Sequence, residues 1–217
     1  MRIVVTGASG FIGRGLLAGL SAAGHGGWAT GREPPPQVPE GWQSLRRADL
    51  LADKVAAAGA EAIVHLEVKH HVPRPQPADV RAFHETNVGG TEEWLRWAGR
   101  QGVRRFVHVS SIKAAPPGES REQVAGGTGP ADSAPVLPAA PYGRSKALAE
   151  AAVRDWAAAA ADRAAVILRP APVYGPGNEA NLAAFVRQVS AGRPCLIGAG
   201  DAPKSVVSRT NVVAAIA

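Results

Sequence analysis

Near its N-terminus the chain reads Thr6-Gly7-Ala8-Ser9-Gly10-Phe11-Ile12-Gly13, and this stretch decides the fold. It follows a short apolar run, Ile3-Val4-Val5, and it opens a segment of helical periodicity from Phe11 to Ala23. The glycines allow a tight turn and a close approach of helix to strand, and the start of a helix carries partial positive charge. A strand, a glycine-rich turn and a helix in this order are typical of a site that binds a dinucleotide through its pyrophosphate.

The alternation of strand and helix recurs along the chain. Apolar β-branched runs lie at residues 63–66, 106–109 and 166–168, helical periodicity covers 80–102 and 142–161, and weaker strands are expected near 28–32 and 42–45. This order predicts an α/β fold, a Rossmann-type doubly wound parallel sheet with helices on both faces. The proline-rich segments 33–41 and 114–140 are predicted to be irregular loops.

Composition narrows the class of protein. The 217 residues are 46% hydrophobic and 19% charged, as in a globular domain. The sequence has neither an apolar stretch long enough to span a membrane nor the pattern of a signal peptide, so we expect a cytoplasmic protein. The single cysteine, Cys195, excludes an intrachain disulfide, and no metal site is expected. The net charge is +6, but the arginines are scattered, which favours a solvated basic surface over a nucleic-acid or membrane partner.

Two positions bear on the choice of dinucleotide. After the second expected strand the chain reads Gly31-Arg32-Glu33, and an arginine there favours the 2′-phosphate of NADP over the ribose hydroxyls of NAD. Arg32 as a plain solvated charge is the alternative. Asp49 is spaced either to end the third strand beside the adenine or to cap a helix over residues 51–59, and both interpretations stay open.

A second group of residues indicates chemistry. Tyr142 and Lys146 are four residues apart, so they lie on one face of the expected helix, where an ammonium near the phenol would lower the pKa of Tyr142. Alone, this spacing is common by chance. Ser111, however, follows the strand at 106–109, at the edge where a hydroxyl faces the ligand crevice, although a serine there also suits a turn cap.

Together these motifs resemble the extended short-chain dehydrogenase/reductases, and within them the NAD-dependent epimerase/dehydratase family that acts on nucleotide sugars. The resemblance covers essentially the whole chain. It rests on the glycine turn at 6–13, Ala-Ile-Val-His-Leu at 62–66, Asn-Val-Gly-Gly-Thr at 87–91, Gly-Val-Arg-Arg-Phe-Val-His-Val-Ser-Ser at 102–111, Pro-Tyr-Gly-Arg-Ser-Lys at 141–146 and Leu-Arg-Pro-Ala-Pro-Val-Tyr-Gly-Pro-Gly at 168–177.

The resemblance implies roles for individual residues. Ser111, Tyr142 and Lys146 would be catalytic, with Tyr142 as general acid or base. The residues expected at NAD or NADP are Gly7, Ser9, Gly10, Phe11, Ile12, Gly13, Arg32, Asp49, Leu50, Leu66, Asn87, Tyr142, Lys146, Pro170 and Val173. A nucleotide sugar would contact Ser111, Asn181, Leu182 and Lys204.

The resemblance also implies an organisation. Residues 1–170 would form the NAD(P)-binding domain and 171–217 a partial, truncated substrate lobe, because relatives continue for about another hundred residues, the size of a small domain. A homodimer would form through the helices that begin near Val80 and Tyr142.

Two departures from the family pattern affect the expected activity. Glu67 stands where a small residue usually lines the cofactor, which brings a carboxylate near an anionic ligand unless it turns away. Ile112-Lys113 replace the acidic pair of sugar 4,6-dehydratases. The sequence therefore favours a nucleotide-sugar epimerase that transfers a hydride at sugar C4 through a 4-keto intermediate. An NADPH-dependent 4-keto-sugar reductase is the first alternative, and a non-catalytic NAD(P)-binding regulator or scaffold is the alternative of another class.

Overall fold

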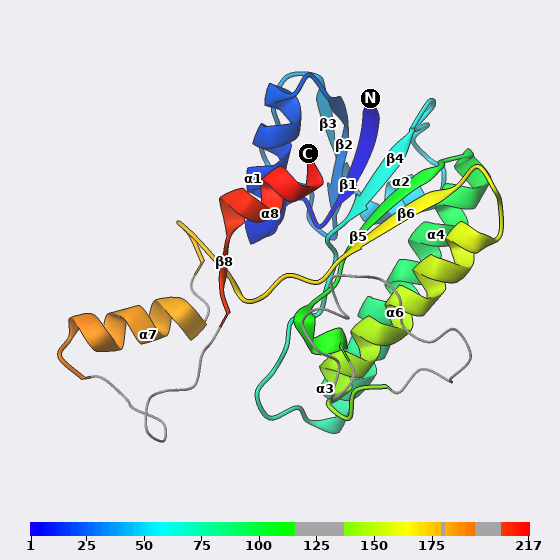
Figure 1. Cartoon of the computed structure of the whole chain (residues 1–217). Coiled ribbons are helices and arrows are strands. Elements are labelled where there is room, and N and C mark those ends of the chain that lie inside the picture. Colours follow the sequence, from blue (N-terminus) through cyan, green and yellow to red (C-terminus); the bar gives the residue numbers. More distant parts are fainter. Residues whose placement is uncertain (116–136, 179–180, 194–204) are drawn as a thin grey trace.

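A computed structural model describes residues 1–115, 137–178, 181–193 and 205–217 of the chain. Its centre is a six-stranded parallel sheet in the order β3-β2-β1-β4-β5-β6 (Figure 1). The strands are β1 (Arg2–Thr6), β2 (Gly26–Gly31), β3 (Trp42–Arg46), β4 (Ala62–His65), β5 (Arg105–Val109) and β6 (Ala164–Leu168). The strand order reverses between β1 and β4, as in a doubly wound sheet. The predicted fold class is confirmed, and both weaker strands form as β2 and β3.

The register of the strands brings four carboxyl ends to one edge of the sheet. Thr6 lies opposite Thr30 of β2 and His65 of β4, and His65 lies opposite His108 of β5. Doubly wound sheets bind ligands outside this edge, at the point where the strand order reverses. The glycine turn after β1 and Ser111 after β5 both start from it.

Helices cover both faces of the sheet (Figure 1). Helices α1 (Phe11–Ala22) and α8 (Arg209–Ile216) pack on one face, and α4 (Gly90–Gln101) and α6 (Pro141–Ala158) pack on the other. Successive residues of β1 serve the two cores in turn: Val4 joins the core under α4 and α6, whereas Ile3 and Val5 join the core under α1. This alternation follows from the pleat of a buried strand.

The helical stretch expected at 80–102 is longer and less regular than its periodicity indicates. It comprises α3 (Pro77–Phe83), a π-helical segment η1 (His84–Gly89) and α4. Its start is defined by Pro77 at the first helical position and by a capping box between Gln76 and Asp79. Segments of π-helix inside helices occur frequently at functional sites, and this one buries Asn87.

The C-terminal elements depart from the central sheet and then return to it. A parallel pair, β7 (Val173–Tyr174) and β8 (Val207–Ser208), and the helix α7 (Asn181–Ser190) lie outside the sheet, with α7 drawn in orange in Figure 1. Helix α8 packs against α1, where a Cβ added at Gly19 would lie 2.7 Å from Val213 Cγ1. Within the described residues, no helix combines the length and apolarity needed to cross a membrane.

Candidate active site

The glycine turn has the geometry of a cradle for an anion. Gly7 has φ +63°, and a Cβ there would lie 2.9 Å from the Leu66 carbonyl carbon. A Cβ on Gly13 would lie 2.6 Å from the carbonyl oxygens of both Gly7 and Ala8. Gly10 caps α1 without a side-chain hydrogen bond, and the first turn carries no acidic residue. The amides at the start of α1 are therefore not occupied by a cap, which suits a cofactor pyrophosphate.

The neighbouring cofactor positions lie around this turn. Ser9, Gly10 and Arg32 are exposed, whereas Phe11, Ile12 and Leu66 are half-buried. A Cβ on Gly31 would come within 3.5 Å of Ser9 Oγ, so the end of β2 lies directly against the turn. Arg32 follows on the exposed side of this contact. The structure thus brings the glycine turn and the end of β2 together, as a dinucleotide site requires.

Asp49 fits neither of the two placements expected for it. Strand β3 already ends at Arg46, and Asp49 lies in the first turn of the short helix α2 (Arg47–Leu51), whose N-cap is Arg46. Because the helix begins at Arg47 rather than near residue 51, Asp49 lies in its first turn, where a negative charge suits the helix dipole, and does not cap a helix over residues 51–59. Leu50 is fully buried in the core beside α4, and its carbonyl accepts a hydrogen bond from Trp97 Nε1 at 3.0 Å.

Glu67 does not add an uncompensated charge to the site. One of its oxygens, Oε2, accepts hydrogen bonds from Arg47 Nε at 3.0 Å and from Trp94 Nε1 at 2.8 Å. Arg47 also pairs with Glu93 of α4. The carboxylate that replaces a small residue after β4 is therefore held toward α2 and α4 by a cation and an indole.

Ser111, Tyr142 and Lys146 converge where β5 meets the start of α6. Tyr142 is largely buried, with a ring edge-on to Phe83 at 5.7 Å and to His71 at 5.6 Å between centroids. Ser111 follows β5 and caps the 3-10 helix η2 (Ile112–Ala114), because its Oγ accepts a hydrogen bond from the Lys113 amide at 3.2 Å. The serine therefore has the turn-capping role and also lies beside the tyrosine, since its side chain hydrogen-bonds Tyr142.

A glycine makes this convergence possible. A Cβ on Gly143 would lie 2.2 Å from the Lys113 carbonyl oxygen, so only glycine lets η2 lie against the first turn of α6. Pro141 starts that turn at the first helical position. The Tyr-Gly pair in the sequence motif thus combines the reactive side chain with the space that the serine loop needs.

Lys146 does not lower the pKa of Tyr142 in the way that the sequence spacing indicates. Lys146 is 1% exposed, and its ammonium donates a hydrogen bond to the Val109 carbonyl at 2.8 Å. Burial raises the pKa of Tyr142, and the hydrogen bond with Ser111 opposes that shift only in part. Burial also lowers the pKa of Lys146 to about 8, while the charge of Glu150 raises it. Lys146 is therefore charged and Tyr142 protonated at neutral pH.

Asn87 connects the loop after β4 to the helix of Tyr142. Its Oδ1 accepts a hydrogen bond from the Lys69 amide at 2.8 Å, and its Nδ2 donates to Ser145 Oγ at 2.9 Å. Ser145 Oγ in turn donates to the Tyr142 carbonyl at 2.8 Å. Asn87, which was predicted to contact the cofactor, is thus buried and ties the loop after β4 to the start of α6.

A buried histidine extends this network to β1. His65 Nδ1 lies 2.8 Å from Thr6 Oγ1, and His65 Nε2 lies 3.1 Å from Thr91 Oγ1. Burial lowers the pKa of His65 to about 3, with a further contribution from the charge of Lys146. The imidazole is therefore neutral and acts as a fixed link between the glycine-turn strand and α4.

The remaining predicted residues lie at the far side of the crevice. Pro170 is half-buried, and its carbonyl accepts a hydrogen bond from the Ile112 amide at 3.2 Å; Val173 is half-buried in β7. Asn181 begins α7 and Leu182 is half-buried there. The Asn181 side chain, Lys204, Cys195 and most of the loop expected at 114–140 lie outside the described residues. Of the residues predicted to contact the substrate, the structure places Ser111 beside Tyr142.

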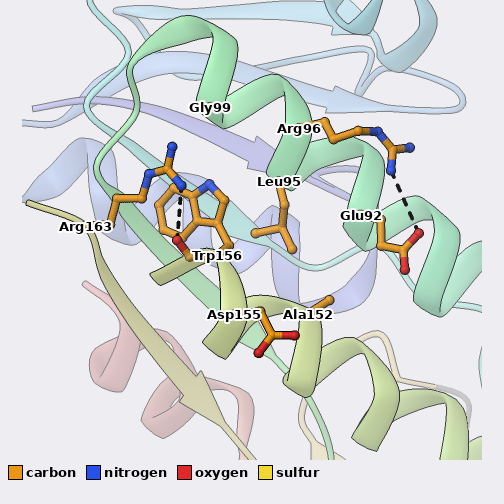
Figure 2. Close-up of a pocket in the computed structure, with 8 residues that line it drawn as sticks. All are labelled: Glu92, Leu95, Arg96, Gly99, Ala152, Asp155, Trp156 and Arg163. Atoms are coloured by element: carbon orange, nitrogen blue, oxygen red, sulfur yellow. Dashed lines mark hydrogen bonds and ion pairs between the residues drawn. The ribbon is translucent and has the colours of Figure 1, made fainter. Parts of the chain in front are cut away.

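A hollow on the surface lies elsewhere, between α4 and the second half of α6 (Figure 2). Its lining includes Leu95, Ala152 and Trp156, and the Arg163 guanidinium lies over the Trp156 ring at 4.8 Å. Its residues on α6 lie in the second half of that helix, whereas Tyr142 lies in the first turn. Among the described residues, no three potential metal ligands cluster at either place.

Comparison with known proteins shows the family of the chain. Residues 3–217 match the NAD dependent epimerase/dehydratase family. The chain is 28% identical over 97% of its length to N-acetyl-alpha-D-glucosaminyl-diphospho-ditrans,octacis-undecaprenol 4-epimerase of Escherichia coli O157:H7, covering 60% of that protein. It is 33% identical over 98% of its length to UDP-glucose 4-epimerase of Mycolicibacterium smegmatis, covering 71% of it.

Solved structures agree with this match. MoeE5 in complex with UDP-glucuronic acid and NAD superposes with a TM-score of 0.78 at 26% identity, over 100% of this chain and 71% of that one. This chain spans about six tenths of the length of two relatives, the E. coli epimerase (60%) and the 2-alkyl-3-oxoalkanoate reductase of Stenotrophomonas maltophilia (59%). By its sequence match, its doubly wound sheet and its glycine cradle, the chain belongs to the NAD-dependent epimerase/dehydratase family of extended short-chain dehydrogenase/reductases.

Proposed function

We propose that the protein is a nucleotide-sugar epimerase that acts at C4 of the sugar through a 4-keto intermediate. The observation that carries this proposal is the convergence of Ser111, Tyr142 and a charged Lys146 at the sheet edge that also holds the glycine cradle. Relatives named UDP-glucose 4-epimerase support the choice of reaction. A dinucleotide bound at the glycine cradle would supply the hydride acceptor and donor for this chemistry.

The side chains have distinct roles in this proposal. Tyr142 takes the proton from the sugar hydroxyl as its phenolate when the carbon is oxidised, and the phenol formed in this step returns that proton when the ketone is reduced. Ser111 hydrogen-bonds the same oxygen and Tyr142, while Lys146 keeps a buried positive charge one helical turn from the tyrosine. Asn87 holds the loop and the helix start that orient Tyr142.

A 4-keto-sugar reductase that uses NADPH is the second candidate, and Arg32 is the observation that favours it. A reductase uses the same three side chains but exchanges its cofactor after each turnover. Among the relatives, 2-alkyl-3-oxoalkanoate reductase of Stenotrophomonas maltophilia is 32% identical over 93% of this chain. A non-catalytic NAD(P)-binding regulator is the candidate of another class, and it has no use for three reactive residues.

The substrate lobe is proposed to start at residue 171, after the NAD(P)-binding domain of residues 1–170. Leu182 near the start of α7 and the predicted residues Asn181 and Lys204 would contact the diphosphate of the nucleotide sugar, since the N-terminus of a helix suits anionic groups.

Calorimetry on this chain tests the proposed function. We expect binding of a dinucleotide, followed by binding of a UDP- or dTDP-hexose to the loaded protein, and interconversion of C4 epimers. Release of oxidised cofactor with a reduced sugar would instead indicate the reductase. Dinucleotide binding without any sugar response in the panel would favour the regulator, and no dinucleotide binding at all would overturn the proposal.

Arg32 tests the preference for NADP. We expect Arg32→Ser to weaken NADP(H) binding by about 10- to 100-fold, the worth of a hydrogen bond to a charged group, because the 2′-phosphate loses its cation. Binding of NAD(H) should change little. The matched control is Arg105→Ser, since Arg105 is exposed at the opposite edge of the sheet. Equal losses for both cofactors would show that Arg32 does not select the phosphate.

The protein is also proposed to form a homodimer through the face of α4 and α6 that contains the hollow in Figure 2. The half-buried Ala152 lies in that hollow beside Leu95 and Trp156. Light scattering should give twice the monomer mass, and Ala152→Arg should give the monomer mass. Ala18→Arg, at an exposed position of α1, is the control and should stay dimeric. A monomeric unmodified protein would contradict this proposal.

A further inference from the structure

One turn beyond Lys146, helix α6 carries a second fully buried charge, Glu150. Its carboxylate is surrounded by donors: Ser110 Oγ at 2.6 Å, Arg169 Nε and Nη2 at 2.9 and 2.7 Å, and Arg154 Nη2 at 2.9 Å. Arg169 is bidentate and its side chain is only 17% exposed. A buried carboxylate with this many donors is ionised, because the donors outweigh its desolvation and keep the pKa of Glu150 below its usual value.

Two of these donors stand at the carboxyl ends of neighbouring strands. Ser110 directly follows β5, and Arg169 directly follows β6. The Ser110 amide also donates to the Leu168 carbonyl at 2.7 Å. Glu150 therefore joins the ends of both strands to the helix that carries Tyr142 and Lys146.

The strand ends held in this way carry the active-site groups. The Val109 carbonyl, which accepts from Lys146 Nζ at 2.8 Å, belongs to the residue before Ser110, and Ser111 is the residue after it. On β6, the residue after Arg169 is Pro170, whose carbonyl accepts from the Ile112 amide at 3.2 Å. A movement of the Glu150 carboxylate would thus shift the acceptor of Lys146 and the loop of Ser111 together.

Among the described residues, Glu150 is the negative charge that compensates the buried ammonium of Lys146. The other titratable groups that face it are His65 on β4, His70 in the loop after β4 and His108 on β5, along with Tyr142 one turn earlier on α6. Burial and the charge of Lys146 lower the pKa of all three histidines, so they are neutral. Only Glu150 among these groups favours the charged form of Lys146.

We propose that Glu150 is a positioning residue of the active site, which acts through Ser110 and Arg169 on the two strand ends and through its charge on Lys146. This inference rests on the proposed function of Tyr142 and Lys146, and it adds the group that holds them in a working arrangement.

The test is a pH titration of Lys146 in the Glu150→Gln variant, observed by NMR on protein that is labelled at the lysine ε-carbon. Lys146→Met identifies the signal. We expect the midpoint of Lys146 to fall by about one pH unit, because an opposite charge within a few ångströms has been removed. Asp162→Asn is the matched control: it makes the same carboxylate-to-amide change in an exposed ion pair with Arg104, and its Lys146 midpoint should match the unmodified protein.

A double variant guards against failure to fold, because Glu150→Gln alone takes from Arg169 the carboxylate with which it forms a bidentate ion pair. Glu150→Gln with Arg169→Gln removes both charges, and the Lys146 midpoint should still fall. An unchanged midpoint in a folded variant would overturn the proposal. A double variant that does not fold would assign Glu150 to stability alone and would overturn it as well.

The activity readout separates positioning from a general loss of structure. If the proposed function holds, kcat of Glu150→Gln should fall at least about tenfold. The decline of kcat at alkaline pH should also begin at a lower pH than in the unmodified enzyme, because Lys146 loses its proton at a lower pH. Dinucleotide affinity should stay unchanged. The lysine titration needs no substrate, so it decides the role of Glu150 even if the sugar chemistry proves different.

Discussion

Replacing Tyr142 by phenylalanine is expected to reduce turnover of the nucleotide sugar by about 1,000-fold or more, the upper range for loss of a general acid or base. The phenyl ring keeps the edge-on contacts with Phe83 and His71, so the start of α6 should retain its packing. Only the hydroxyl that bonds Ser111 is lost. We therefore expect the dissociation constant of the dinucleotide and the thermal unfolding midpoint to stay nearly the same.

The chain offers a close control for this change, because it holds only two tyrosines. Tyr174 lies in β7 and is 42% exposed. Tyr174→Phe removes the same hydroxyl group from another place and should leave turnover within the error of the assay. If Tyr142→Phe instead weakens dinucleotide binding as strongly as it slows turnover, Tyr142 has a structural role and the proposed mechanism is wrong.

The fold follows from local patterns, and the sequence contains these patterns in full. Runs such as Ile3-Val4-Val5 and Ile63-Val64-His65 are buried on both faces, as expected of a parallel sheet covered by helices on both sides. Leu16, Leu17 and Leu20 mark one face of α1. The position of Asp49 was missed because helix α2 has only five residues, too few to show a periodicity.

The places of Tyr142 and Lys146 in the fold were also predictable, but their hydrogen-bond partners were not. Tyr142 and Lys146 share a helix face by spacing alone. The acceptor of the Lys146 ammonium is a backbone carbonyl 37 residues away, and nothing in the sequence marks Val109 as that acceptor. Glu150 carries a weak signal, since it is one helical turn from Lys146, but its pairing with Arg169 depends on how β6 is placed beside α6.

Glu67 illustrates the same limit for charge. In the sequence, Glu67 is an acidic residue next to the edge expected to bind an anionic dinucleotide, and a negative charge there argues against dinucleotide binding. In the structure, Arg47 and Trp94 hold the carboxylate from two other elements, so it need not repel a ligand. The sign of a side chain's charge can be read from the sequence, whereas the groups that compensate this charge depend on how the elements pack.

A second large effect is expected from Gly13→Ala, which tests whether the cradle is as close-packed as the structure has it. The added Cβ would lie 2.6 Å from the carbonyl oxygens of Gly7 and Ala8, so the turn must open. Overpacking of this kind costs about 1–3 kcal/mol in the free energy of unfolding. The same opening moves the first-turn amides of α1, and we expect dinucleotide binding to weaken by at least about tenfold.

Gly99→Ala provides the matched control for this prediction. Gly99 also lies in a helix, α4, but a Cβ there would have only ordinary contact, at 3.6 Å from Arg163 Nη2. Alanine favours a helix interior over glycine by about 0.5–1 kcal/mol, so this variant should be slightly more stable and should bind the dinucleotide normally. Urea unfolding and calorimetry on both variants check the pair. Normal dinucleotide affinity in Gly13→Ala would mean that the turn relaxes without cost, and that the cradle does not depend on the absence of a side chain at residue 13.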